Sequence, residues 1–110
     1  MPDFLFLFRE PDGRAEPHSP EFTTEHQKQW AEWLGPLRNS GQLKSGGSLS
    51  LDGVSISPDG TAAEEIHRAG KEIVGGFLLV SAPDLATATA LAKNCPVLKA
   101  DGTIEVRRVQ

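Results

Sequence analysis

His26 is the side chain in this sequence best suited to proton chemistry. His26 lies with Trp30 on an apolar stripe, in a segment whose other positions are polar. Packing against a core removes water from an imidazole and favours its neutral form, which can act as a general base. The same pattern also fits a packed histidine that only hydrogen-bonds to its surroundings. It likewise fits Trp30 either as the wall of a pocket or as a core aromatic residue.

Cys95 is the only cysteine of the chain, so it forms no internal disulfide. We expect it at the C-terminal end of a helix, where the negative end of the helix dipole opposes the formation of a thiolate. A cysteine in that place is a poor nucleophile. We therefore predict a small buried side chain that borders a site and does not attack a substrate.

Two groups of charged side chains are further candidates for substrate binding. His67 and Lys71 flank Arg68 and could hold an anionic group together with it, although solvated charges on a loop have the same pattern. Glu105 and Arg107 share one face of an expected strand. They could line a cleft, or form an ordinary exposed ion pair.

The sequence predicts no metal site and no cofactor. Its three histidines lack the close spacing that zinc ligands share. The glycine pair at residues 46–47 precedes an expected strand, and the pair at residues 75–76 begins one. Neither pair forms the glycine-rich turn that leads from a strand into a helix and holds phosphate.

The net charge and the length of the chain exclude several classes of protein. The chain has 11 Lys and Arg against 15 Asp and Glu, which gives a net charge of −4. No basic stripe is interleaved with aromatic residues, so we expect no binding to nucleic acid or to an anionic membrane surface. The length fits one domain over residues 1–110. The absence of a long apolar run and of a signal peptide predicts a cytoplasmic protein.

One helix over about residues 20–40 is expected to position the histidine. Ser19 is a good N-cap and Pro20 a good first helical residue, with a second possible start at Thr24. Apolar side chains then recur every three or four residues, which predicts a helix that packs on a sheet. Pro36 should bend the helix or alter its last turn.

The other expected elements are strands and one more helix. Residues 4–8 and 73–80 are apolar runs and predict strands that are buried on both faces. Residues 103–109 alternate as a strand does. A second helix should begin after the N-cap Asp84 and run to Cys95. Prolines and charges at residues 10–20 predict an exposed loop, which contains His18.

The strongest local signal is Asp52-Gly53, which alternating apolar residues flank. This pattern predicts a hairpin over residues 49–56 with a two-residue turn. Residues 57–60 predict another turn. Residues 62–68 fit either a short helix or an edge strand.

The order of these elements predicts an α+β fold, a ferredoxin-like sandwich in which both helices cover one face of the sheet. The strands at residues 4–8 and 73–80 would then leave apolar side chains in water on the other face. That exposure would cost about as much free energy as the whole stability of a small domain. We therefore expect a homodimer whose two sheets face each other.

Six short motifs, in an order and spacing that span nearly the whole chain, carry a resemblance to a known family. They are His26 with Trp30, Gly41-x-Leu43-x-x-Gly46, Lys71-Glu72-x-x-Gly75-Gly76-Phe77, Pro83-Asp84-Leu85, Asn94-Cys95-Pro96 and Ile104-Glu105-Val106-Arg107. The sequence resembles the YCII-related family, including the branch named for a DGPF motif, within the dimeric α+β-barrel group. This resemblance implies a ferredoxin-like protomer and a barrel-shaped homodimer.

Two positions depart from that family. Residues 64–67, Glu-Glu-Ile-His, stand where relatives of the DGPF branch carry the motif that names it. In other members a histidine that matches His26 pairs with an aspartate before a proline, and Cys95 takes the place of that aspartate here. The resemblance thus implies that Cys95 is a neighbour of His26 and that the imidazole lacks a carboxylate partner at this position.

Three classes of function stay open. The first is a cofactor-independent enzyme that acts on a small molecule in a pocket centred on His26. The second is a non-catalytic small-molecule-binding or regulatory dimer, which the missing aspartate and the missing DGPF motif favour. The third is a purely structural dimer. A pocket that His26 lines would favour the first two classes, whereas a cleft filled with side chains would favour the third.

Overall fold

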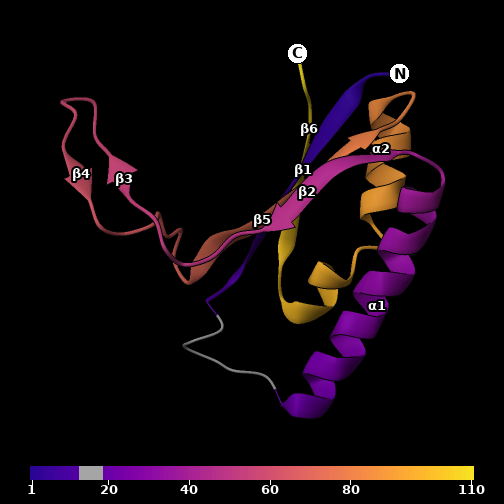
Figure 1. Ribbon diagram of the computed structural model, residues 1–110, viewed down its shortest axis with the longest axis horizontal. Helices are drawn as coiled ribbons and strands as arrows, with labels where there is room; N and C mark the ends of the chain where they lie inside the picture. The colour runs from indigo at the N-terminus through magenta and orange to yellow at the C-terminus, as the bar shows by residue number, and fades with distance from the viewer. Residues whose placement is uncertain (13–18) are drawn as a thin grey trace.

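The computed structural model of the protein describes residues 1–12 and 19–110. Four antiparallel strands form its main sheet in the order β2-β5-β1-β6. They are β1 (Asp3–Pro11), β2 (Leu43–Ser48), β5 (Glu72–Ser81) and β6 (Thr103–Arg108). The helices α1 (Pro20–Asn39) and α2 (Leu85–Ala92) lie on one face of this sheet, together with the short 3-10 helix η1 (Pro96–Ala100) (Figure 1). This arrangement confirms the predicted α+β ferredoxin-like sandwich.

The core lies between β1 and the helices. Phe4, Phe6 and Phe8 alternate along β1 and are at most 5% exposed, as period-two alternation requires. Trp33 of α1 stacks on Phe6 with the ring centroids 6.4 Å apart, and its indole N–H donates to the carbonyl of Leu91 at 3.1 Å. Helix α1 is therefore fixed both to the sheet and to α2.

Helix α1 begins where its capping residues predict. The Ser19 side chain accepts a hydrogen bond from the backbone N–H of Phe22 at 3.1 Å, and Pro20 is the first helical residue. Pro36 lies inside the last turn, and the helix ends at Asn39. The predicted loop that contains His18 falls largely on residues 13–18, outside the described residues.

The hairpin predicted over residues 49–56 is wrong. The two-residue strand β3 (Ser55–Ile56) pairs instead with β4 (Ala62–Ala63), and the turn lies at residues 57–60. Gly60 supplies the positive φ of 89° that this turn uses. Strand β2 forms the edge of the main sheet. The glycines at residues 46–47 therefore lie inside a strand, whereas the sequence predicted that they precede one.

The second helix is shorter than predicted. Asp84 caps α2 by accepting from the Thr87 N–H at 2.8 Å, and this hydrogen bond lowers the pKa of the Asp84 carboxyl. The helix ends at Ala92, and Cys95 becomes the N-cap residue of η1, which the sequence did not predict. Leu85 is 55% exposed, so the buried stripe of α2 consists of Ala88 and Ala92.

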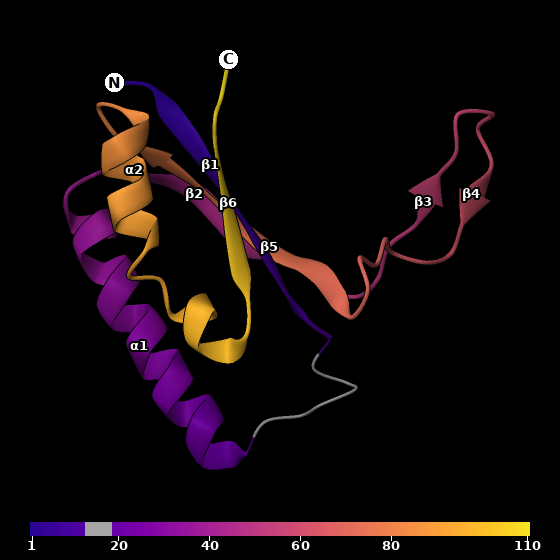
Figure 2. The same ribbon diagram turned by 180° about the vertical axis from the view of Figure 1, so that it is seen from behind.

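The opposite face of the sheet carries no helix in the described part of the chain (Figure 2). Leu5 and Leu7 of β1 point to this outer face, as do Phe77 and Leu79 of β5, and all four side chains are half-buried. The sequence left open which face of β1 the helices cover. The structure gives that face to the three phenylalanines, so the outer face belongs to the leucines.

A narrow arm projects from the sandwich. We call residues 49–71, which include β3 and β4, the arm (Figure 1). The Cα radius of gyration is 15.3 Å, against about 13 Å for a compact chain of this length. Arg68 ties the base of the arm to Asp12 through an ion pair of 2.8 Å. Among the described helices, none is long and apolar enough to cross a membrane.

Candidate functional site

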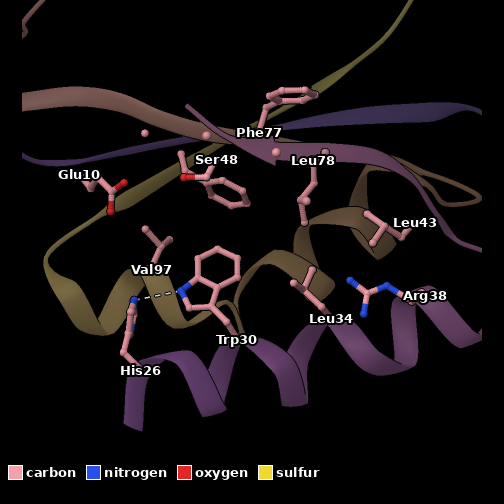
Figure 3. Close-up of a pocket in the computed structure, with 15 residues that line it drawn as sticks. Glu10, His26, Trp30, Leu34, Arg38, Leu43, Ser48, Phe77, Leu78 and Val97 are labelled. Carbon is pink, nitrogen blue, oxygen red and sulfur yellow. Dashed lines mark hydrogen bonds between the residues drawn. The ribbon is translucent and has the colours of Figure 1, made fainter. Parts of the chain in front are cut away.

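A pocket of about 470 Å³ lies between α1 and the sheet (Figure 3). This volume is in the usual range of small-molecule sites. The pocket is lined by Phe8, Glu10, His26, Trp30, Leu34, Arg38, Leu43, Gly46, Gly47, Ser48, Gly75, Gly76, Phe77, Leu78 and Val97. Its surface is mostly apolar, and three ionisable side chains, Glu10, His26 and Arg38, border it.

One face of α1 forms the floor of the pocket. His26, Trp30, Leu34 and Arg38 follow each other at intervals of four residues, so they lie in one row along the helix. Figure 3 shows this row facing the underside of the sheet. The pocket thus runs along the helix axis, with His26 at one end and Arg38 at the other.

Trp30 fixes the ring of His26. The indole N–H of Trp30 donates to Nε2 of His26 at 2.9 Å, and the ring of Phe22 stacks on the imidazole with centroids 5.4 Å apart. Because Nε2 accepts this hydrogen bond, the neutral imidazole carries its own hydrogen on Nδ1. In this arrangement His26 is a hydrogen-bond donor, and it becomes a base at Nε2 only when the bond from Trp30 opens.

Glycines of β2 and β5 form the ceiling. They carry no Cβ, so the backbone of both strands borders the pocket, with the Leu78 side chain against Gly46 and the Glu10 side chain against Gly75. The register between β1 and β5 shifts after Phe8, and this bulge lies beside Gly75. A Cβ at Gly75 would collide with the carboxylate of Glu10. The glycine therefore leaves room for that carboxylate.

Glu10 and Arg38 give the pocket two different polar ends. Glu10 projects from β1 on the same side as His26, whereas Arg38 reaches in from the last turn of α1 beside Leu43 (Figure 3). Neither Glu10 nor Arg38 is among the site residues predicted from the sequence. The signals were present: Glu10 continues the alternation of Phe4, Phe6 and Phe8, and Arg38 continues the four-residue row of His26.

Cys95 does not line this pocket. Its side chain is 2% exposed and belongs to the core between the sheet and the helices. Burial raises the pKa of the Cys95 thiol from 9.0 to about 12, so the thiol stays protonated at neutral pH. The position within the fold differs from the expectation, because Cys95 precedes η1 and does not end α2.

The remaining predicted site residues lie elsewhere. His67 and Lys71 are exposed in the arm. Glu105 and Arg107 of β6 oppose Leu7 and Leu5 in the register, which places them on the outer face of the sheet. There Arg9 binds the Glu105 carboxylate at 2.7 Å. The structure thus brings only His26 and Trp30 of the predicted residues into the pocket.

The described residues contain no group of three or more His, Cys, Asp or Glu side chains that could hold a metal ion. The ionisable groups that line the pocket are one carboxyl, one imidazole and one guanidinium. These groups can donate protons, accept protons and bind an anion.

Comparison with solved structures finds the fold in 5-chloro-2-hydroxyhydroquinone dehydrochlorinase (TftG) from Burkholderia phenoliruptrix AC1100, solved in complex with 2,5-dihydroxybenzoquinone. The two chains are 22% identical with a TM-score of 0.54, and the match covers 96% of this chain and 93% of that one. No curated protein matches the sequence. A sequence profile of the YCII-related domain matches residues 7–110. The chain therefore belongs to the YCII-related family.

Proposed function

We propose that the protein is a cofactor-independent enzyme that binds a small organic molecule between α1 and the glycine ceiling. The observation that carries the proposal is the pocket itself, which combines apolar walls with a carboxyl and an imidazole at one end. Small-molecule sites typically have this composition, with a few polar groups that fix the orientation of the ligand. A pocket lined by His26 speaks against a purely structural role.

Glu10 and His26 would divide the proton chemistry between them. While Trp30 occupies Nε2, the imidazole can only donate, through Nδ1, and because this atom is buried the ring must turn before it reaches a ligand. A carboxylate accepts hydrogen bonds and protons, so Glu10 supplies the complementary base. This assignment gives the enzyme a donor and an acceptor without the aspartate that other family members carry at the position of Cys95.

The fold neighbour is consistent with a small-molecule site. TftG is named as a dehydrochlorinase of a substituted hydroquinone, and its structure holds a dihydroxybenzoquinone. A molecule of that kind is small compared with the pocket between α1 and the sheet. This likeness supports a ligand of that size class.

The alternative is a non-catalytic binding module. Cys95 in place of the family aspartate favours it, and so does the sequence Glu-Glu-Ile-His at residues 64–67 where the DGPF branch has its motif. We further propose that the chain belongs with the DGPF branch, within the dimeric α+β-barrel group. We also infer a homodimer, because the outer face of the sheet exposes apolar side chains on neighbouring strands.

The test is a thermal-shift screen of small organic molecules that includes 2,5-dihydroxybenzoquinone, followed by product analysis of each hit. We expect at least one hit to raise the melting temperature and to be converted. Glu10→Gln should bind the hit and lose its conversion by at least tenfold, while His67→Asn, an exposed residue of the arm, should behave as wild type. Hits that bind but are never converted would favour the binding module. A binding constant unchanged in Trp30→Ala would contradict this pocket.

A further inference from the structure

We propose that the pocket selects small carboxylic acids that carry a hydroxyl group at their far end. Arg38 would hold the carboxylate, Trp30 and Leu34 would contact the apolar body, and Glu10 would accept the hydrogen bond of the hydroxyl. The inference rests on the proposed function, since it names the class of ligand for the same pocket.

Arg38 has the features of an anion-binding residue. It lines the pocket, and in the part of the chain that the structure describes its guanidinium makes no ion pair and no hydrogen bond. Guanidinium presents five N–H donors in a planar fork that matches a carboxylate. Leu34 and Leu43 line the pocket beside it, whereas Arg38 itself is exposed, so an anionic group can reach the fork from solvent.

Glu10 fixes the direction of the ligand. A second carboxylate at its end of the pocket would meet a group of like charge, which is unfavourable. A hydroxyl at that end would donate a hydrogen bond to Glu10 instead. Because Arg38 lies at the opposite end (Figure 3), only one orientation satisfies both groups.

The geometry of α1 gives an upper bound on the length of the ligand. His26 and Arg38 are twelve residues apart, which corresponds to about 18 Å between their Cα atoms in a helix. Their side chains lean into the pocket and shorten the gap between the polar groups. A single ring with a short acid chain fits such a space, whereas acetate would reach only one end.

Arg38 also has a structural explanation, because a cation in the last turn of a helix interacts favourably with the helix dipole. That role would affect the stability of the protein but not its choice between an acid and an ester. The experiment therefore measures selectivity, which only the binding role changes.

The probes are 3-(4-hydroxyphenyl)propanoate, its methyl ester and 3-phenylpropanoate, titrated against the wild-type protein. The readout is the NMR signal of the Trp30 indole N–H, which the hydrogen bond to His26 makes specific to the pocket. We expect the hydroxy acid to bind at least tenfold more tightly than its ester. Arg38→Gln should reduce this ratio to near one, and Arg38→Lys should keep part of it. Lys28→Gln removes a charge from an exposed position of the same helix and should leave the ratio unchanged.

The second polar end has its own comparison. Wild type should prefer the hydroxy acid over 3-phenylpropanoate, and Glu10→Gln should weaken that preference. Equal affinity for acid and ester, with the Trp30 signal shifted by both, would overturn the acid selectivity and leave the proposed pocket intact. No shift of the Trp30 signal by any probe would overturn this inference, and only the absence of hits in the screen as well would overturn the proposed function.

Discussion

The indole N–H of Trp30 decides which proton the His26 ring can give or take. A histidine on an apolar stripe suggests a base, but the 2.9 Å hydrogen bond to Nε2 makes the neutral ring a donor at Nδ1. The chemistry of this residue thus depends on its neighbour one helical turn away. The conversion of a ligand would require Glu10 or an opened Trp30–His26 bond to accept the proton.

Cys95 should make the stability of the protein sensitive to alkaline pH. Burial raises the pKa of its thiol from 9.0 to about 12, so above pH 9 the unfolded chain ionises while the folded protein does not. Stability is therefore complete below pH 9 and declines as the pH rises towards 12. At pH 10.5 the loss from this group is up to about 2 kcal/mol.

Urea unfolding at pH 8 and at pH 10.5 measures this loss. Cys95→Ala has no thiol to ionise, so its unfolding free energy should fall less over the same interval. The chain has no tyrosine, which removes one competing alkaline titration. Equal losses in the two proteins would show that the thiol is not the cause.

Single residues of the site could be predicted only in part. His26 and Trp30 were found because helical spacing places them on one row with the core residues of α1. Glu10 and Arg38 extend the same two patterns, but charged side chains at the ends of apolar stripes usually face solvent. Only the three-dimensional approach of β1 to α1 shows that they border one pocket.

At the scale of elements, the pairing of β2 with β5 depends on a glycine in β5. Gly76 of β5 lies opposite Ser48, and a Cβ on Gly76 would stand 2.8 Å from the carbonyl oxygen of Gly47. The neighbouring backbone cannot yield as a flexible side chain would. Close approach of β2 to β5 therefore requires glycine, and the same bare backbone forms the ceiling of the pocket.

Gly76→Ala should destabilise the protein by about 1–3 kcal/mol, because the added methyl group overlaps backbone atoms. Gly47→Ala is the matched control from the same pair of strands. Its Cβ would meet nothing closer than Phe77 at 3.9 Å, which is ordinary contact, so its effect should be clearly smaller. Chemical denaturation of both variants gives the comparison, and similar losses would refute the steric explanation.

Elements that begin with a local hydrogen bond were predicted correctly. Elements whose formation depends on which segment pairs with the edge of the sheet were not. The caps Ser19 and Asp84 act through bonds within three residues, so the starts of both helices could be read from the sequence. A hairpin at Asp52-Gly53 would be stable only if the apolar residues on both sides of the turn packed against a sheet. Since β2 took the edge of the sheet, Val54 and Ile56 stay exposed and the turn formed at residues 57–60 instead.

At the scale of the whole molecule, the outer face of the sheet is the surface that a second copy would cover. We expect sedimentation equilibrium at micromolar concentration to give about 24 kDa, twice the 11.8 kDa of one chain. Leu7→Asp places a charge on the outer face and should yield a folded monomer, because one side of this residue already faces solvent.

Phe6→Asp separates folding from association. Phe6 is 0% exposed on the helix side of β1, so this substitution should unfold the protomer and not merely split the dimer. A wild-type mass of about 12 kDa would contradict the homodimer. So would a Leu7→Asp protein that remains a dimer.

The sandwich contains the whole pocket, and the arm contains none of it. None of the residues that line the pocket lies in residues 49–71, and the Glu-Glu-Ile-His sequence at residues 64–67 falls entirely within them. The residues at 64–67 therefore lie outside the set that lines the pocket. A change of length or sequence within the arm would therefore leave every residue that lines the pocket in place.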